Sequence, residues 1–156
     1  MSFVISGLSP KPFQPLFGLS DDALAKRRIV RRTVDAPQGF PCRVTLQDAL
    51  PGETVLLMNY EHQPADTPFR SRHAIFVREG VEDRSFAPGE IPPAFAARQF
   101  LSLRAFDVDG MMIDADITPT VELDAAIERL LANPQAAYLH AHYAGAGCYA
   151  ARIDRA

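Results

Sequence analysis

The chain has 156 residues, of which 47% are hydrophobic and 22% are charged, and its formal net charge is −3. These values are typical of one globular domain and exclude a disordered or fibrous chain, and the slight acidic excess argues against a nucleic-acid-binding protein. No apolar run approaches the roughly 20 residues of a membrane span and no signal peptide is recognisable, so we expect a soluble cytoplasmic protein. Because the cytosol is reducing, we expect its two cysteines to be free thiols.

The first half of the chain predicts strands separated by proline-rich connections. Apolar runs and alternation predict strands over residues 2–8, 29–35, 54–62 and 73–79. Between the first two, Ser20 is a suitable N-cap for a short helix, because Asp21 and Asp22 favour the positive end of the helix dipole. Three prolines predict an extended path over residues 10–18, and residues 45–49 predict one helical turn.

The second half predicts two hairpins and two helices. The hairpins are expected over residues 100–107 with 111–117 and over 137–143 with 148–154, and the helices over residues 92–99 and 123–131. A three-residue loop in the first hairpin places Arg104 opposite Asp114 and gathers Leu101 and Ile117 on one apolar face. The order of elements predicts an α+β fold, a single domain of residues 1–156 with a largely antiparallel β-sheet and about three helices.

The closing hairpin contains the most potential chemistry. On a strand, His140 and His142 point to the same face with Cα atoms about 6.5–7 Å apart, so the two imidazoles could share one metal ion. A zinc, iron or manganese site needs a third protein ligand, for which the candidates are Cys148, His62, Glu61 or an aspartate. In the alternative interpretation, these histidines line a half-buried sheet face and bond to neighbours or water.

The position of the Cys148 thiol depends on the length of the hairpin loop. A three-residue loop with Gly147 in the left-handed region puts Cys148 on the histidine face and His140 opposite Arg152. A four-residue loop puts Tyr143 opposite Cys148 and turns the thiol away. The sequence leaves both arrangements open.

Several arginines lie at strand ends or in loops, and two or three that converged on a cleft would imply a small anionic ligand, because the guanidinium group binds carboxylate or phosphate through a planar fork. In the alternative interpretation, these arginines are solvated at the surface. A cation beside a cysteine would also favour a reactive thiolate. The candidate ligand-binding residues are Cys42, Arg43, Tyr60, His62, Arg104, His140, His142 and Cys148, and the candidate metal ligands are His140 and His142. The sequence identifies no catalytic residue, no oligomeric state and no cofactor other than this candidate transition metal.

We therefore expect a domain that binds a small ligand in a pocket formed by the loop at Cys42, the polar end of strand 54–62 and the closing hairpin. One alternative is a metal- or thiol-dependent enzyme centred on His140, His142 and Cys148. Another is a protein-interaction module without a small-molecule site. Neither nucleic acid nor a membrane is expected as a partner.

Four segments, in order, carry a resemblance to a known family. They are GFPCRVTLQDALPGETVLLMNYEH (39–62), HAIFVRE (73–79), RQFLSLRAFDVDGMM (98–112) and YLHAHYAGAGCYAARIDRA (138–156). Together they resemble the bacterial family catalogued as domain of unknown function 1203, over about residues 34–156. The family pattern includes residues 41–43, Arg104 and residues 140–148, and Tyr143 stands where the pattern has an asparagine. The resemblance implies no assigned activity.

Overall fold

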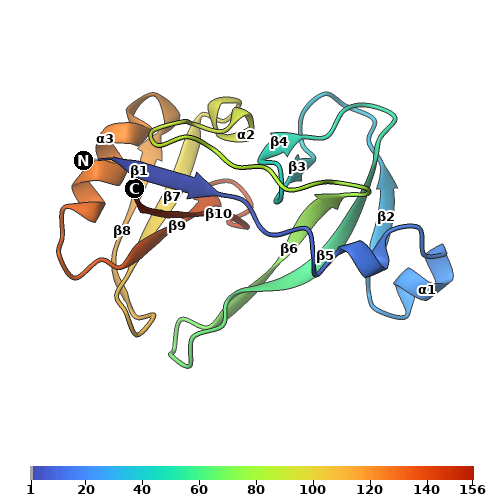
Figure 1. Cartoon of the computed structure of the whole chain (residues 1–156), viewed down its shortest axis with the longest axis horizontal. Coiled ribbons are helices and arrows are strands. Elements are labelled where there is room, and N and C mark those ends of the chain that lie inside the picture. The colour runs from blue at the N-terminus through green and yellow to red at the C-terminus, as the bar shows by residue number, and fades with distance from the viewer. Residues whose placement is uncertain (1) are drawn as a thin grey trace.

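The computed structural model describes residues 2–156 and contains two five-stranded sheets that lie side by side (Figure 1). The first sheet consists of β1 (Phe3–Ser6), β10 (Tyr149–Arg155), β9 (Tyr138–Tyr143), β7 (Phe100–Phe106) and β8 (Met112–Pro119), in that order. The second consists of β2 (Val30–Thr33), β5 (Thr54–Gln63), β6 (Ser71–Arg78), β3 (Pro41–Cys42) and β4 (Gln47–Asp48). Of these pairings, only β3 with β6 is parallel, so the predicted α+β, largely antiparallel fold is confirmed, with its strands divided between two sheets.

Three short helices complete the fold: α1 (Asp21–Ala25), α2 (Pro93–Ala96) and α3 (Leu123–Leu131). Two 3₁₀ turns, η1 (Gln14–Leu16) and η2 (Thr120–Glu122), precede α1 and α3. In Figure 1, α3 lies at one end of the molecule with the first sheet, and α1 lies at the other end with the second. Within the described residues, no helix is long and apolar enough to cross a membrane.

The first sheet has one apolar face and one polar face. Leu103, Leu139 and Ala141 are fully buried in a core that includes Ile127 of α3. Because side chains alternate along a strand, the neighbouring residues of β7 and β9 point away from this core. Arg104 lies opposite His140 and Ser102 opposite His142, so the polar face carries both histidines.

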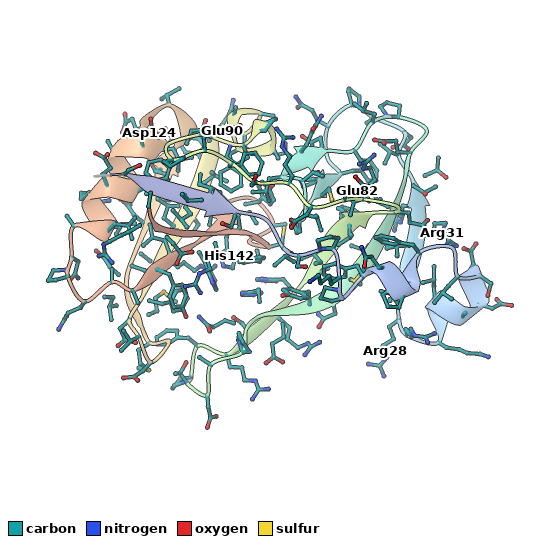
Figure 2. The ribbon with its side chains drawn as sticks, viewed as in Figure 1. Arg28, Arg31, Glu82, Glu90, Asp124 and His142 are labelled. Carbon is teal, nitrogen blue, oxygen red and sulfur yellow. The ribbon has the colours of Figure 1, made fainter. Side chains whose placement is uncertain are left out.

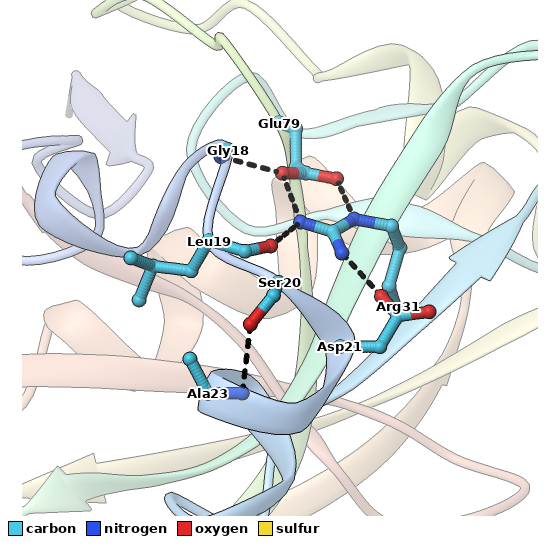
Figure 3. Close-up of polar contacts among 7 residues, drawn as sticks. All are labelled: Gly18, Leu19, Ser20, Asp21, Ala23, Arg31 and Glu79. Carbon is cyan, nitrogen blue, oxygen red and sulfur yellow. Dashed lines mark hydrogen bonds and ion pairs between the residues drawn. The ribbon is translucent and has the colours of Figure 1, made fainter.

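The second sheet has its own apolar core and a polar network beside α1. Figure 3 shows Arg31 donating to both carboxylate oxygens of Glu79, at 2.6 and 3.0 Å, and to the Leu19 carbonyl at 2.6 Å. Asp21 also pairs with Arg31, and the Gly18 amide donates to Glu79. The Arg31 guanidinium lowers the pKa of Glu79 to about 2.

The sequence correctly locates the short helix of this region. The Ser20 hydroxyl accepts a hydrogen bond from the Ala23 amide at 3.1 Å, which satisfies one of the free donors of the first helical turn (Figure 3). The prediction of a fully extended segment before it is wrong, because η1 forms there. Its proline lies in the first turn, where no amide donor is needed.

Residues 45–49 do not form the predicted helical turn. They form the end of a tight hairpin in which β3 and β4 pair antiparallel. Leu46 adopts a positive φ of 51° and is fully buried in the core of the first sheet. Burial of this side chain therefore overrides the local preference for a helix.

The predicted loop of the β7–β8 hairpin is correct but its register is wrong. The Asp107 amide donates to the Met111 carbonyl and Gly110 has a φ of 83°, as a three-residue loop requires. A bulge then leaves Ile113 unpaired, so Arg104 lies opposite Ala115 instead of Asp114. Ile117 is consequently 62% exposed and not on the apolar face.

The closing hairpin combines features of both expected arrangements. The Tyr143 amide donates to the Cys148 carbonyl at 2.9 Å, which defines the four-residue loop and puts the thiol on the face away from the histidines. Gly147 nevertheless has a φ of 78°. A bulge at Ala150 shifts the following register, so His142 lies opposite Tyr149 and His140 opposite Arg152.

Candidate metal centre

All four histidines of the chain lie together between the two sheets, although they come from three different strands. The ring of His62, on β5, is centred 5.0 Å from that of His142 and 6.1 Å from that of His140. His73, on β6, stacks on His62 with ring centroids 5.4 Å apart. Figure 2 shows His142 on the side of the first sheet that faces the second.

Two local features of the backbone bring these rings together. On β9, alternation puts His140 and His142 on the face opposite α3. On β5, the pairing with β6 runs from Glu61 opposite Arg72 to Gln63 opposite Ser71, which leaves His62 without a cross-strand partner. Bulges of this kind redirect a side chain, and here the bulged residue is the one that reaches the first sheet.

Three of the histidines are buried and lack hydrogen-bond partners for ring nitrogens. His142, His140 and His62 are 0%, 4% and 7% exposed. The unpartnered atoms are both nitrogens of His62, Nδ1 of His140 and Nε2 of His142. One potential ligand atom from each of the three lies within 4.8 Å of the others. In a tetrahedral zinc site, two nitrogen ligands are about 3.3 Å apart, so the rings would have to move closer together to bind one ion.

The tautomer of His142 is set by the hairpin loop. Its Nδ1 lies 2.9 Å from the carbonyl oxygen of Gly147. Because a carbonyl oxygen can only accept, Nδ1 carries the proton and Nε2 keeps its lone pair. This is the arrangement found in metal-binding histidines, in which the distal nitrogen donates to a carbonyl or carboxylate.

Aromatic rings enclose the three histidines and keep them neutral. Tyr149 stacks on His62, and its ring centroid lies 5.1 Å from that of His140. Burial, with a smaller contribution from nearby charges, lowers the pKa of His62 to about 4 and those of His140 and His142 to about 3. At neutral pH, the lone pairs of these rings are therefore available to a metal ion.

Arg104 lies beside this centre on β7, opposite His140. Within residues 2–156, its guanidinium has no hydrogen-bond or ion-pair partner, and burial lowers its pKa. Its charge also contributes to the lowered pKa values of the three histidines. An anion bound between Arg104 and the histidines would satisfy this charge.

Comparison with known proteins places the chain in one family. The family model described as a protein of unknown function, DUF1203, matches residues 39–155. The chain belongs to the DUF1203 family. The match contains the three histidines and Arg104, and it confirms the resemblance seen in the sequence. No curated protein and no solved structure matches the chain.

The structure of this DUF1203 protein separates the candidate residues into three places. His62, His140 and His142 adjoin Arg104 at the histidine centre. Arg43 donates to the Cys148 sulfur at 3.2 Å on the other face of the closing hairpin.

Cys42 and Tyr60 belong to the core of the second sheet. The Cys42 sulfur accepts from the Arg78 amide, and Tyr60 packs on Phe13 with ring centroids 5.9 Å apart. Both cysteines are free, as expected. Of the third ligands considered, Glu61 binds Arg70 and Arg72 instead, and His62 is the residue that joins His140 and His142.

Three further residues of this DUF1203 domain, His73, Tyr143 and Tyr149, were not expected at a site from the sequence. His73 lies directly opposite Tyr60 in the β5–β6 pairing, so aligning the two predicted strands would have placed it near the end of β5. Tyr149 lies opposite His142 on the histidine face, as the four-residue loop requires, so it could not be placed while the length of that loop was open.

Proposed function

We propose that this protein binds a divalent transition-metal ion through His62, His140 and His142. The observation that supports the proposal is the group of buried, unpartnered imidazole nitrogens within 4.8 Å of one another. A buried polar atom without a partner costs about 1–3 kcal/mol, so three such rings side by side are unfavourable unless something binds them.

The donor set favours zinc and the other nitrogen-preferring metals. Neutral imidazole suits zinc, copper, iron and nickel, whereas magnesium and calcium require oxygen ligands. Three protein ligands leave a position open on a tetrahedral ion, which is the arrangement of catalytic rather than structural zinc sites. The open position would carry water or a substrate, and bound water at such a site ionises near neutral pH.

Arg104 favours an anionic ligand at the open position. Three neutral histidines do not offset the charge of a divalent cation, and the nearby guanidinium adds a further positive charge. A small anion that bridges the metal and Arg104 would balance both. A metal ion with a bridging anion would combine two expectations from the sequence, a small anionic ligand and a metal-dependent enzyme. His62 would then replace Cys148 as the third residue of the centre.

The wider setting that we infer is the cytoplasm of a bacterium. The free cysteines are compatible with a reducing compartment, and the net charge of −3 supports a small-molecule partner over nucleic acid.

Metal analysis and calorimetry test the proposal. Zinc added to EDTA-treated, dialysed protein should bind with a stoichiometry of about one, and His62→Ala, His140→Ala and His142→Ala should each weaken binding at least about 100-fold. His73→Ala is the matched control, because His73 touches the same rings but does not belong to the group of converging ligand atoms. It should retain stoichiometric binding, with at most a tenfold loss typical of a neighbouring residue.

Cobalt substitution gives a second readout that does not depend on an activity. Three nitrogen ligands in a tetrahedral site should give the intense visible absorption of four-coordinate cobalt. Absence of stoichiometric binding by zinc or cobalt, or equal binding by the His62→Ala variant, would contradict the proposal.

A further inference from the structure

A second site lies on the other face of the closing hairpin. A cavity of about 420 Å³ is present there, within the roughly 300–1,000 Å³ range of small-molecule pockets. Gly39, Ala74 and Ala146 are exposed at its rim. Leu57 and Phe76 supply an apolar wall, and Arg43 and Tyr143 supply polar groups.

Arg43 is the unusual residue of this cavity. Its side chain is only 1% exposed, yet no carboxylate pairs with it anywhere in the described part of the chain. It donates to the carbonyl oxygens of Tyr149 and Pro41, at 2.7 and 2.6 Å, and to the Cys148 sulfur. These three bonds use three of the five N–H groups of a guanidinium, and the positive charge has no acidic partner.

Tyr143 adds a free donor to the same cavity. Its hydroxyl is buried without a hydrogen-bond partner, and the residue is 7% exposed. Burial raises the pKa of Tyr143 to about 12, so at neutral pH the hydroxyl keeps its proton and can donate. The guanidinium groups of Arg43 and Arg98 lie over its ring, at 5.0 and 5.2 Å from the centroid.

The second arginine of the cavity is already neutralised. Arg98 binds both carboxylate oxygens of Asp48, at 2.5 and 2.8 Å. No acidic residue lines the cavity. The uncompensated charge is therefore the single positive charge of Arg43, whose remaining N–H groups and the Tyr143 hydroxyl are donors that require an acceptor. His73 also lines the cavity, and its Nδ1 is buried without a partner.

We propose that this cavity binds a small organic monocarboxylate with an apolar body. The carboxylate would accept from Arg43 and from the Tyr143 hydroxyl, since a planar anion matches the guanidinium fork and balances one positive charge. The apolar body would lie against Leu57 and Phe76. This site adjoins the histidine centre at His73, which lines the cavity and stacks on His62. Cys148 and Tyr143, however, point away from the face that carries His140 and His142.

A titration followed by NMR tests the proposal with two pairs of probes. Benzoate and isovalerate are the carboxylates, and benzamide and isovaleramide are neutral molecules of the same shape. The experiments are carried out in EDTA, so that a carboxylate bound to metal at the histidine centre is not mistaken for occupancy of the cavity. At least one carboxylate should shift the amide signals of Tyr143 and Cys148 in a saturable manner, and its amide should bind at least about tenfold more weakly.

Variants at the rim and at the hydroxyl complete the test. Ala146→Phe fills the entrance from an exposed loop and should abolish the shifts, whereas the same substitution at the exposed end of α3, Ala132→Phe, should leave them unchanged. Tyr143→Phe removes only the donor and should weaken carboxylate binding about tenfold or more. Arg43→Met is less suitable, because its hydrogen bonds also join β3 to the closing hairpin.

Several outcomes would overturn the proposal. These are failure of both carboxylates to saturate, equal binding of an acid and its amide, or unchanged binding by Ala146→Phe. Inorganic phosphate that binds as tightly as the carboxylates would also overturn it, because the apolar wall would then contribute nothing. Zinc binding at the histidine centre is measured separately, so either site can fail without the other.

Discussion

Two polar clusters of the molecule are partly or fully buried: the Arg31 network, in which Arg31 binds Glu79 and Asp21, and the histidine centre of His62, His140 and His142. They differ in whether their polar atoms have hydrogen-bond partners. Around Arg31, both oxygens of Glu79 accept from the guanidinium, and the Leu19 carbonyl and Asp21 take further bonds (Figure 3). Around His62, neither ring nitrogen has a partner. The polar groups of the first cluster satisfy one another, whereas the unpartnered nitrogens of the second carry a free-energy cost when nothing is bound to them.

The two clusters should respond to acid in different pH ranges. In metal-free protein, His62, His140 and His142 have pKa values of about 4, 3 and 3 in the folded state, below the usual value near 6.5. The unfolded chain therefore binds more protons, and stability falls as the pH drops below about 6.5. Three such groups give a slope of at most about 4 kcal/mol per pH unit between pH 6 and 4.

Titration of Glu79 also lowers stability as the pH falls, but it does so in a lower pH range. Its pKa is lowered from 4.5 to about 2, so its stabilising contribution is full above pH 4.5 and is lost as the pH falls toward 2. Urea titrations of metal-free protein at a series of pH values would separate the two ranges. Stability that is constant between pH 6.5 and 5 would contradict the assignment of three buried neutral histidines.

Removal of the acidic partner should weaken the Arg31 network. Glu79→Gln leaves the guanidinium without its main partner in a site where the glutamate side chain is 14% exposed. We expect a loss of about 2 kcal/mol in the free energy of unfolding at pH 7, less than for a fully buried pair. Urea denaturation measures it, and Glu90→Gln on an exposed turn is the control. An unchanged free energy would show that the network contributes nothing to stability.

The corresponding change in the histidine centre should have the opposite effect. His62→Phe keeps a ring that can stack on Tyr149 but removes two unpartnered nitrogens. In EDTA, we expect the free energy of unfolding to stay the same or rise by up to about 1 kcal/mol. Zinc at 100 times its dissociation constant should stabilise the parent protein by about 2.7 kcal/mol and the variant not at all. A loss as large as that in Glu79→Gln would mean that the histidines stabilise the metal-free fold.

The smallest expected effect concerns the unpaired arginine beside the histidines. Arg104→Gln removes a positive charge from the neighbourhood of a bound cation and should tighten zinc binding about three- to tenfold at low salt. Arg27→Gln, on the distant α1 end of the molecule, should leave zinc affinity unchanged. Weaker zinc binding in Arg104→Gln would imply that the guanidinium positions a ligand and does not simply repel the ion.

Local sequence signals predicted the elements of the fold but not its three bulges, one of which directs His62 toward the first sheet. Ser20, Gly110 and the apolar spacing of α3 identify a cap, a loop and a helix, because each depends on neighbouring residues. The bulges at His62, Ile113 and Ala150 depend on how whole sheets pack, and no glycine or turn residue marks them. His140 and His142 could therefore be placed on one face, whereas the third candidate ligand could not. The side of the Cys148 thiol depended on the length of the hairpin loop, which the sequence left open.

The pairing of β1 with β10 has a consequence for how the protein matures. Phe3 lies opposite Arg155, and Ile5 lies opposite Ile153, so the first strand cannot take its place until the last one has been synthesised. Contacts this distant in sequence make folding slow, and chains emerge from the ribosome at about 5–20 residues per second. His62 and His73 are likewise synthesised well before β9, the strand that supplies the other two histidines. The complete centre therefore forms only once β9 has been made and the two sheets have packed together, so a metal ion would be selected by the folded domain and not by the separate strands.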